Sequence, residues 1–389
     1  MEYYKRALEL QNETVVNRRW FHTNAEAGLH MPKAQAYVME RLTEYGLTPQ
    51  TCGEGVTAAL GKGGRVLLLR ADMDALLMPE ESGEPFACPT GTEAHACGHD
   101  FHPAMLLTAA KMLKEREDEL AGTVRLMFQP AEETFEGARN MIEHGILEGV
   151  DAALAFHVSP GRMPVGLFMY NSGGTMMYSV DGFRITVRGR GSHGAYPQNA
   201  IDPINIAVHI YLGLEALIAR EVDPGKACVL TIGNFSAGSA ANIIPDTALL
   251  QGTIRTNDRV SRELLVRRME EVAVRTAEVY GGSAEVEMIS DVPPLICDAR
   301  LTDEMVGYMT EQDIPGLTPV PGISASASED FASVAELVPT AYMYLSAGFP
   351  DERGDAPAHN PKVRFNEDVC PIGAASLAHC AARWLESHP

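Results

Sequence analysis

The sequence predicts an α/β protein, in which a mixed, largely parallel sheet flanked by helices carries an inserted βαββαβ domain. Short apolar runs alternate with helical patterns in the first part of the chain, as in proteins with parallel sheets. After about residue 181 the expected strands instead alternate apolar and polar residues, which is typical of a sheet with one solvated face. Apolar runs return near the end of the chain, which predicts that the last segment rejoins the first sheet.

The elements of the larger domain follow from these patterns. The opening stretch to about Tyr45 has apolar residues at helical spacing. Pro103 lies in the first turn of another expected helix, 103–114, where a proline is tolerated. Strands that are buried on both faces appear as continuous apolar runs. Such runs occupy residues 65–70, 123–128, 150–156 and, later in the chain, 341–345.

The inserted domain is expected to contain four strands and two helices. One helix, at about 202–218, has Pro203 in its first turn, and the other, 261–280, stops at Gly281 and Gly282. The strands fall at 183–187, 228–232, 247–255 and 284–288. This βαββαβ order is the ferredoxin-like arrangement. We therefore expect residues 1–181 and 295–389 to form one domain and residues 182–294 to form the insertion.

Composition excludes several classes of function. The chain has 389 residues, of which 46% are hydrophobic and 21% are charged, and its formal net charge is -21. A surface this acidic repels polyanions, so nucleic acid is not an expected partner. No run approaches the ~20 apolar residues of a membrane span, and the start lacks the apolar run of a secretory signal. Seven scattered cysteines without a CxxC pair favour a reducing, cytoplasmic location.

The densest chemical signal is a segment with one cysteine and three histidines, His95 to His102. A thiolate and imidazoles are suitable ligands for a borderline-soft metal ion such as zinc. Gly98 lets the backbone bend so that the side chains of Cys97 and His99 converge. The pattern alone is weak, because the same residues also occur as polar loop and helix-start residues.

Three further signals follow expected strands or lie near the end of the chain. Glu132 and Glu133 come directly after a buried strand, so one can bind metal while the other acts as a base. An isolated Glu-Glu pair is otherwise a solvated acidic loop. His157 ends another apolar run, and His359 lies in a later loop. Each histidine alone would be an ordinary hydrogen-bonded residue, but strand ends of one sheet share an edge, so all these side chains could meet.

Jointly, the motifs resemble the two-metal aminoacylase and carboxypeptidase superfamily. The most similar branch contains N-acyl-amino-acid amidohydrolases, hippurate hydrolases and plant auxin-conjugate hydrolases. The resemblance runs along nearly the whole chain in family order. The matching segments are Arg18–His22, Arg70–Leu76, His95–Asp100, Gln129–Glu133, Ser192–Pro197, Ala241–Asp246 and His359–Asn360.

The resemblance implies a site with two divalent metal ions, zinc or manganese, with cobalt and nickel as alternatives. Cys97 would bridge the two ions. One site would be completed by Glu133 and His359, and the other by His99 and His157. Glu132 would be the general base.

The resemblance also implies roles for residues outside the ligand set. His193, in an inserted domain that acts as lid and dimerisation domain, would stabilise the oxyanion in the partner subunit of a homodimer. Asn242 and Arg255 are candidates to hold the substrate. Asp72 and Asp100 would orient ligands, although structural hydrogen bonds explain them equally well. The remaining histidines considered are interpreted as structural: His22, His102, His144 and His209.

The expected reaction is hydrolysis of an N-acyl-L-amino acid, with an acetyl or aryl-acyl group, to a carboxylate and a free amino acid. The same chemistry would serve N-acetyl-diaminopimelate, hippurate or a short dipeptide. A binding protein that kept the fold and lost catalysis is an alternative from another class. A metal-storage or structural zinc protein is a third, but a closed structural site needs no base such as Glu132.

Overall fold

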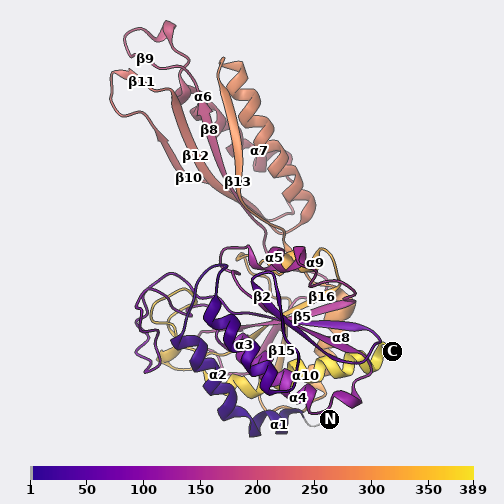
Figure 1. Ribbon diagram of the computed structural model, residues 1–389. Coiled ribbons are helices and arrows are strands. Elements are labelled where there is room, and N and C mark those ends of the chain that lie inside the picture. The colour runs from indigo at the N-terminus through magenta and orange to yellow at the C-terminus, as the bar shows by residue number, and fades with distance from the viewer. Residues whose placement is uncertain (1–2) are drawn as a thin grey trace. The chain divides into compact units, whose positions relative to one another are not determined.

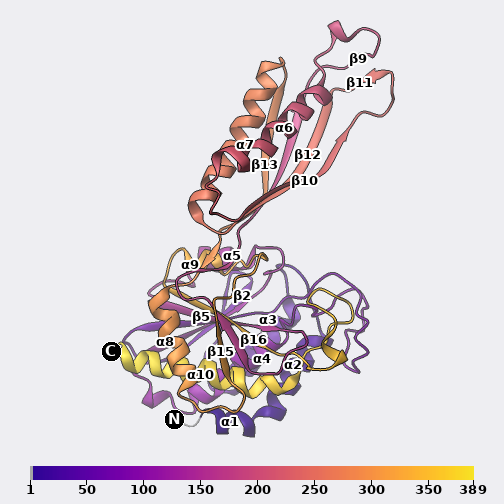
Figure 2. The same ribbon diagram turned by 180° about the vertical axis from the view of Figure 1, so that it is seen from behind.

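The computed structural model describes residues 3–389, so the first two residues of the predicted helical start lie outside it. The chain divides into two compact units. The first comprises residues 1–176, 296–324 and 330–389, and the second comprises residues 177–295 and 325–329. Figures 1 and 2 show the elements of each unit from two sides.

The first unit is built on an eight-stranded sheet with the order β1-β2-β4-β3-β5-β16-β6-β15. Its centre is parallel, because β3 pairs in parallel with β4 and β5, and β5 pairs in parallel with β16. The predicted α/β class with a largely parallel sheet is confirmed. The strands are β1 (Gln50–Cys52), β2 (Gly55–Gly61), β3 (Val66–Asp72), β4 (Thr123–Gln129), β5 (Ala152–Ser159), β6 (Leu167–Tyr170), β15 (Thr318–Pro321) and β16 (Thr340–Ser346).

Two apolar helices form the core beneath this sheet. Helices α4 (Phe101–Lys114) and α10 (Cys370–Ser387) pack against each other and against β3, and nearly all their side chains are buried. A helix that is hydrophobic all round is expected in such a position. Helix α4 thereby has a fixed start at Phe101, directly after the cysteine and histidine segment. The other helices of this unit are α1 (Tyr3–Glu9), α2 (Gln11–Thr23), α3 (Pro32–Glu44), α5 (Gly137–Glu143), α8 (Ala299–Thr310) and α9 (Ala332–Ala335).

The second unit contains an antiparallel sheet with the order β10-β12-β8-β13. Along the chain its elements follow as β8, α6, β10, β12, α7 and β13, and the two helices pack together against the sheet. Their bounds are β8 (Val180–Arg188), α6 (Pro203–Glu221), β10 (Cys228–Ala237), β12 (Thr247–Thr256), α7 (Arg259–Val279) and β13 (Ser283–Val292). A short pair, β9 (Ser192–His193) and β11 (Ile243–Ile244), lies outside this sheet.

Local chemistry explains the helix starts and the buried face of this unit. Asp202 caps α6 by accepting a hydrogen bond from the N–H of Ile204 at 2.9 Å. Asp258 caps α7 by accepting from the N–H of Ser261 at 3.0 Å. Such caps stabilise a helix by about 1 kcal/mol. Alternate residues of β8 are fully buried and form the core with the helices: Phe183, Ile185 and Val187.

None of the helices within residues 3–389 is long and apolar enough to cross a membrane.

Candidate metal centre and active site

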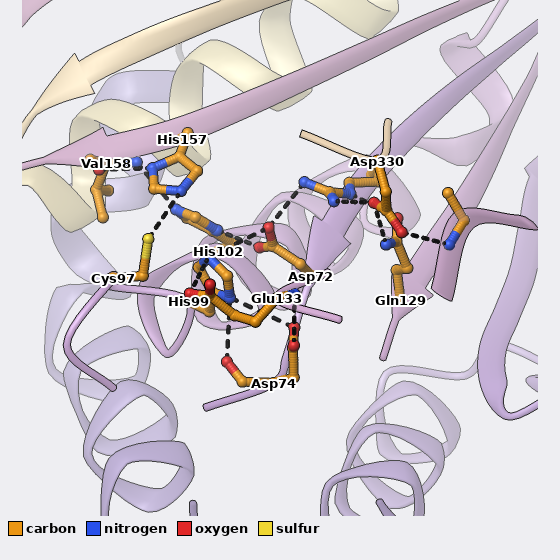
Figure 3. A network of polar contacts seen from close by, with 12 residues as sticks. Asp72, Asp74, Cys97, His99, His102, Gln129, Glu133, His157, Val158 and Asp330 are labelled. Carbon is orange, nitrogen blue, oxygen red and sulfur yellow. Dashed lines mark hydrogen bonds and ion pairs between the residues drawn. The ribbon is translucent and has the colours of Figure 1, made fainter. Parts of the chain in front are cut away.

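The candidate site lies where three neighbouring parallel strands end. Strand β3 ends at Asp72, β4 ends at Gln129 just before Glu132, and His157 lies near the end of β5. Parallel strands end at a common edge of the sheet, and ligands of open α/β sheets bind there. Figure 3 shows the side chains from these strand ends pointing toward one another.

Gly98 sets the path of the segment between Cys97 and His99. Its φ of 94° is in the left-handed region that favours glycine. A Cβ atom at this position would lie 2.5 Å from Val158 Cγ2 and 2.8 Å from Phe365 Cε1. Only glycine therefore lets the backbone pass this close to β5 while the flanking side chains converge.

Replacing this glycine tests the geometry. Gly98→Ala is expected to lower the apparent affinity for Zn²⁺ by about 10- to 100-fold, because displaced support around metal ligands has effects of that size. Isothermal titration calorimetry would measure it. Gly91→Ala is the matched control, since Gly91 also has a positive φ but nothing lies within 4 Å of its Cβ position. Equal Zn²⁺ affinities of the two variants would contradict the prediction.

The structure brings the five predicted ligands together in two groups that share Cys97. One group is Cys97, His99 and His157, and the other is Cys97, Glu133 and His359. Within each group the potential ligand atoms lie within 4.8 Å of one another. Cys97 Sγ lies 3.5 Å from His157 Nε2, and Glu133 Oε1 lies 3.4 Å from His359 Nε2. This is the pairing of ligands that the family resemblance implies.

The backbone is strained where it delivers these residues. His359 has a φ of 62° and Ala131, beside Glu132, has a φ of 53°. Non-glycine residues in this region are uncommon and cluster at functional sites. The N–H of His359 donates to the carbonyl of Ala96 at 2.9 Å, which ties the loop of His359 to the segment of Cys97.

Buried polar atoms without hydrogen bonds show that the residues fit metal ions. His99 donates its Nδ1–H to the carbonyl of Asp74 at 3.0 Å, and its buried Nε2 has no hydrogen-bond partner. Glu133 Oε1 is also buried without a hydrogen bond. His157 donates from Nδ1 to the carbonyl of Val158 at 2.7 Å, which leaves Nε2 facing Cys97. Buried polar atoms normally have partners, and these atoms are the types that bind divalent cations.

The electrostatics of the cluster favour positive charge. The polar interactions with Cys97 and then with Glu133 raise the pKa of His359 to about 10. For His99, burial opposes the charged form, but the charges of Asp72 and Cys97 still raise its pKa well above the usual value. His157 differs, because burial and then the neighbouring His102 hold its pKa well below the usual value.

The two predicted glutamates have different surroundings. Glu133 is held at its backbone, where its N–H donates to Asp74 Oδ2 at 3.0 Å. Glu132 is buried, and its carboxylate lies within 4.8 Å of ligand atoms of His99 and Glu133. It belongs to neither of the groups that contain Cys97. A carboxylate beside the ligands but outside both sets is suitably placed to exchange protons with a water molecule.

Asp72 and Asp100 both lie fully buried beside the site, but they contact different groups. Asp72 Oδ2 accepts a hydrogen bond from Arg70 at 2.8 Å and lies 3.7 Å from His99 Nε2. Asp100 binds Arg18 Nε and His22 Nδ1, each at 2.7 Å, and so anchors the segment of Cys97 to α2. Although burial opposes its ionisation, Arg18 and His22 hold the pKa of Asp100 below its ordinary value.

Sequence reasoning did not identify the buried polar network behind Asp72. The guanidinium of Arg70, at the centre of this network, is completely buried and also binds Gln129 Oε1 at 2.9 Å and Asp330 Oδ1 at 3.3 Å. Gln129 Nε2 in turn donates to Asp330 Oδ1 at 2.7 Å. An arginine inside an otherwise apolar strand was the available signal, because such a charge is buried only when it is paired.

The three remaining predicted residues lie in the second unit. His193 is exposed on β9 and accepts a hydrogen bond at Nδ1 from the N–H of Ala195 at 3.1 Å, which places its ring hydrogen on Nε2. The carbonyl of Asn242 accepts from the N–H of Gly194 at 2.8 Å. Arg255, on β12, is partly buried, and this burial lowers its pKa.

Known proteins are similar to this chain over most of its length. The chain is 34% identical over 383 residues to N-acetyl-L-cysteine deacetylase of Bacillus subtilis, an alignment that covers 97% of this chain and 90% of the relative. It is 34% identical to IAA-amino acid hydrolase ILR1-like 4 of Arabidopsis thaliana, with 95% and 84% covered. The crystal structure of the Bacillus subtilis YXEP protein, a dinuclear metal binding peptidase from the M20 family, superposes with a TM-score of 0.82 at 30% identity, with 97% and 99% covered.

A family model matches most of the sequence. Residues 68–383 match the model for peptidase family M20/M25/M40. The matched range includes all the ligand candidates and the strand ends that position them. The chain therefore belongs to peptidase family M20/M25/M40.

Proposed function

We propose that this protein is a metal-dependent amidohydrolase that cleaves the amide bond of N-acyl-L-amino acids. The observation that carries the proposal is the pair of ligand groups sharing Cys97, with the carboxylate of Glu132 beside them. Two relatives support the substrate class, because one is named an N-acetyl-L-cysteine deacetylase and the other an IAA-amino acid hydrolase. The products would be a carboxylate and a free amino acid.

Cys97, Glu133 and His359 would hold one divalent ion, and Cys97, His99 and His157 would hold the other. Two such metal ions would polarise the scissile carbonyl and activate water at neutral pH. The donor set of one thiolate, three imidazoles and one carboxylate favours zinc by its softness. Manganese is the main alternative, and cobalt or nickel would also bind such ligands.

The residues of the chain perform the proton transfers and hold the substrate. Glu132 accepts the proton of the attacking water and then delivers it to the departing nitrogen, so that the amine leaves as a neutral group. His193 carries a hydrogen on Nε2 that is suited to donate to the oxyanion of the tetrahedral intermediate. The guanidinium of Arg255 can bind a substrate carboxylate, and the side-chain amide of Asn242 can hold its carbonyl.

We also propose that the protein forms a homodimer through its second unit. Within residues 3–389, β10 is an edge strand of its sheet, and it exposes Val229 and Phe235. Helix α6 exposes Val208 and Leu212 one turn apart. Exposed edges and apolar faces are features that proteins cover by pairing.

Light scattering during size-exclusion chromatography would test the dimer. The wild type is expected to have twice the mass of one chain, and Phe235→Glu is expected to shift it toward the monomer. Phe235 is 40% exposed in the single chain, so the substitution does not place a charge in the core. Wild-type protein that elutes as a monomer at micromolar concentration would contradict the proposal.

We propose a cytoplasmic location for the protein. All seven cysteines are free thiols, including the fully buried Cys370 and Cys380. Unpaired thiols are typical of reducing compartments.

A substrate screen tests the proposed reaction. Protein loaded with Zn²⁺, Mn²⁺ or Co²⁺ would be given N-acetyl, N-benzoyl and longer N-acyl amino acids, together with N-acetyl-diaminopimelate and dipeptides. We expect turnover of at least one N-acyl-L-amino acid and its loss after treatment with a chelator. The ratios of kcat/KM would show which acyl group and which amino acid the substrate pocket prefers. Turnover of dipeptides alone would show that the substrates are dipeptides and not N-acyl-L-amino acids. Ligand binding without any turnover would indicate a catalytically dead protein.

A further inference from the structure

Three buried imidazoles pack together in the first unit, but only two of them belong to the proposed ligand set. The ring of His102 lies with its centroid 4.6 Å from that of His157 and 5.4 Å from that of His99. His102 is 2% exposed and comes from the first turn of α4. Figure 3 shows it beside His157, with contacts to Asp72.

Its hydrogen bonds determine which ring nitrogen carries the hydrogen. The N–H of Val158 donates to His102 Nε2 at 2.9 Å. A backbone N–H can only donate, so Nε2 must present a lone pair. The ring hydrogen of the neutral imidazole is therefore on Nδ1, which contacts a carboxylate oxygen of Asp72. Both nitrogens are occupied, which explains why this histidine is not available to bind metal or to take a proton from a substrate.

Through these contacts His102 connects the buried side chains of Arg70 and Asp72 to the backbone of Val158, the residue that follows His157. On one side, Asp72 accepts a hydrogen bond from the buried guanidinium of Arg70 at 2.8 Å. On the other side, Val158 is held at its N–H by His102 and at its carbonyl by His157 Nδ1 at 2.7 Å. The direction in which His157 presents Nε2 toward Cys97 therefore depends on where the backbone of Val158 lies.

We propose that His102 is a positioning residue, fixed as the Nδ1–H tautomer between Asp72 and the N–H of Val158, that orients His157 for metal binding. The inference rests on the proposed function for its catalytic consequence. The hydrogen bonds of His102 that position His157 do not depend on which reaction the protein catalyses. It predicts selective weakening of the metal site that contains His157, whereas loss of general packing would weaken both sites.

The tautomer can be measured on the unmodified, metal-free protein. Long-range proton–nitrogen NMR of histidine labelled with ¹⁵N distinguishes protonated from unprotonated ring nitrogens, and the signal absent from His102→Gln assigns the residue. We expect hydrogen on Nδ1 and none on Nε2. A hydrogen on Nε2 would overturn the proposal.

Two substitutions separate the two contacts. In His102→Gln the side-chain oxygen can still accept from Val158, but the donor to Asp72 is lost. In His102→Asn the amide can still donate to Asp72, but the acceptor for Val158 is lost. Because removing a group that supports a ligand weakens metal affinity by about 10- to 100-fold, the Asn variant is expected to lose that much at one of two Co²⁺ sites. The Gln variant should retain most of the affinity.

His379→Gln is the matched control, since His379 is also buried but lies on α10 and binds Glu311. Calorimetric titration with Co²⁺ should give wild-type values for it. Equal weakening of both sites in the Asn variant, or no weakening, would overturn the proposal. If the wild type hydrolyses no amide while the Asn variant still loses one Co²⁺ site, the proposed function fails and the role of His102 stands. If the wild type is active and the Asn variant matches it in kcat and Co²⁺ binding, the role of His102 fails alone.

Discussion

Glu132→Gln is expected to lower kcat by about 10²- to 10⁴-fold, the usual contribution of a general acid–base group. The amide of glutamine fills nearly the same space but cannot accept the proton of the attacking water. Metal binding should persist, because Glu132 is outside the two groups that share Cys97. Steady-state kinetics on the best substrate from the screen, combined with metal analysis of the same samples, would measure both properties.

Glu136→Gln is the control for this experiment. Glu136 lies four residues away in the same loop and is exposed, where it accepts a hydrogen bond from Thr134 Oγ1 at 2.9 Å. Its substitution should leave kcat and metal content unchanged. If Glu132→Gln loses metal along with activity, Glu132 is a ligand and its assignment as the base is wrong.

Arg70→Met is expected to destabilise the protein by about 3–5 kcal/mol, the typical cost of removing one partner of a buried ion pair. The side chains of Arg70 and Asp72 are both 0% exposed. Burial would raise the pKa of Asp72, but the charge of Arg70 holds it well below its usual range. Methionine has a similar length without the charge, so Asp72 and Asp330 would lose their guanidinium partner.

Urea denaturation of metal-free protein would measure the change in the free energy of unfolding. The matched control is Arg65→Met, because Arg65 pairs with Asp151 at the surface, where its side chain is 56% exposed. A surface ion pair contributes about 0–1 kcal/mol. Similar effects of the two substitutions would show that Arg70 is not the electrostatic centre of the buried network.

The sequence predicted those parts of the fold that depend on local patterns. Each strand expected in the second unit overlaps an observed one. Successive side chains of a strand point to opposite faces of the sheet, so the alternation of apolar and polar residues shows which face is buried. The strand at 228–232 is longer than predicted and runs to Ala237 as β10, where most side chains are exposed and alternation fades. The β1–β2 hairpin was not predicted, because the segment is short and rich in glycine and lacks a long apolar run.

The candidate site was partly predictable for a similar reason. The ends of neighbouring parallel strands lie at one edge of the sheet. Glu133 after β4 and His157 on β5 therefore both lie near Cys97. The contact between Arg70 and Asp330 joins residues 260 positions apart, and no local pattern encodes such a pairing. The placement of His193, Asn242 and Arg255 near a substrate stays a prediction.

The buried Nε2 atom of His99, which has no hydrogen-bond partner, has a consequence for the stability of the protein in a cell. Each buried polar group without a partner costs about 1–3 kcal/mol, so the apo form has a larger unfolded fraction than the metal-bound form. An ion that binds only the folded state stabilises it by an amount that rises with the logarithm of the free ion concentration. Proteases act on the unfolded fraction, so the abundance of the enzyme should follow the supply of its metal as well as the rate of its synthesis.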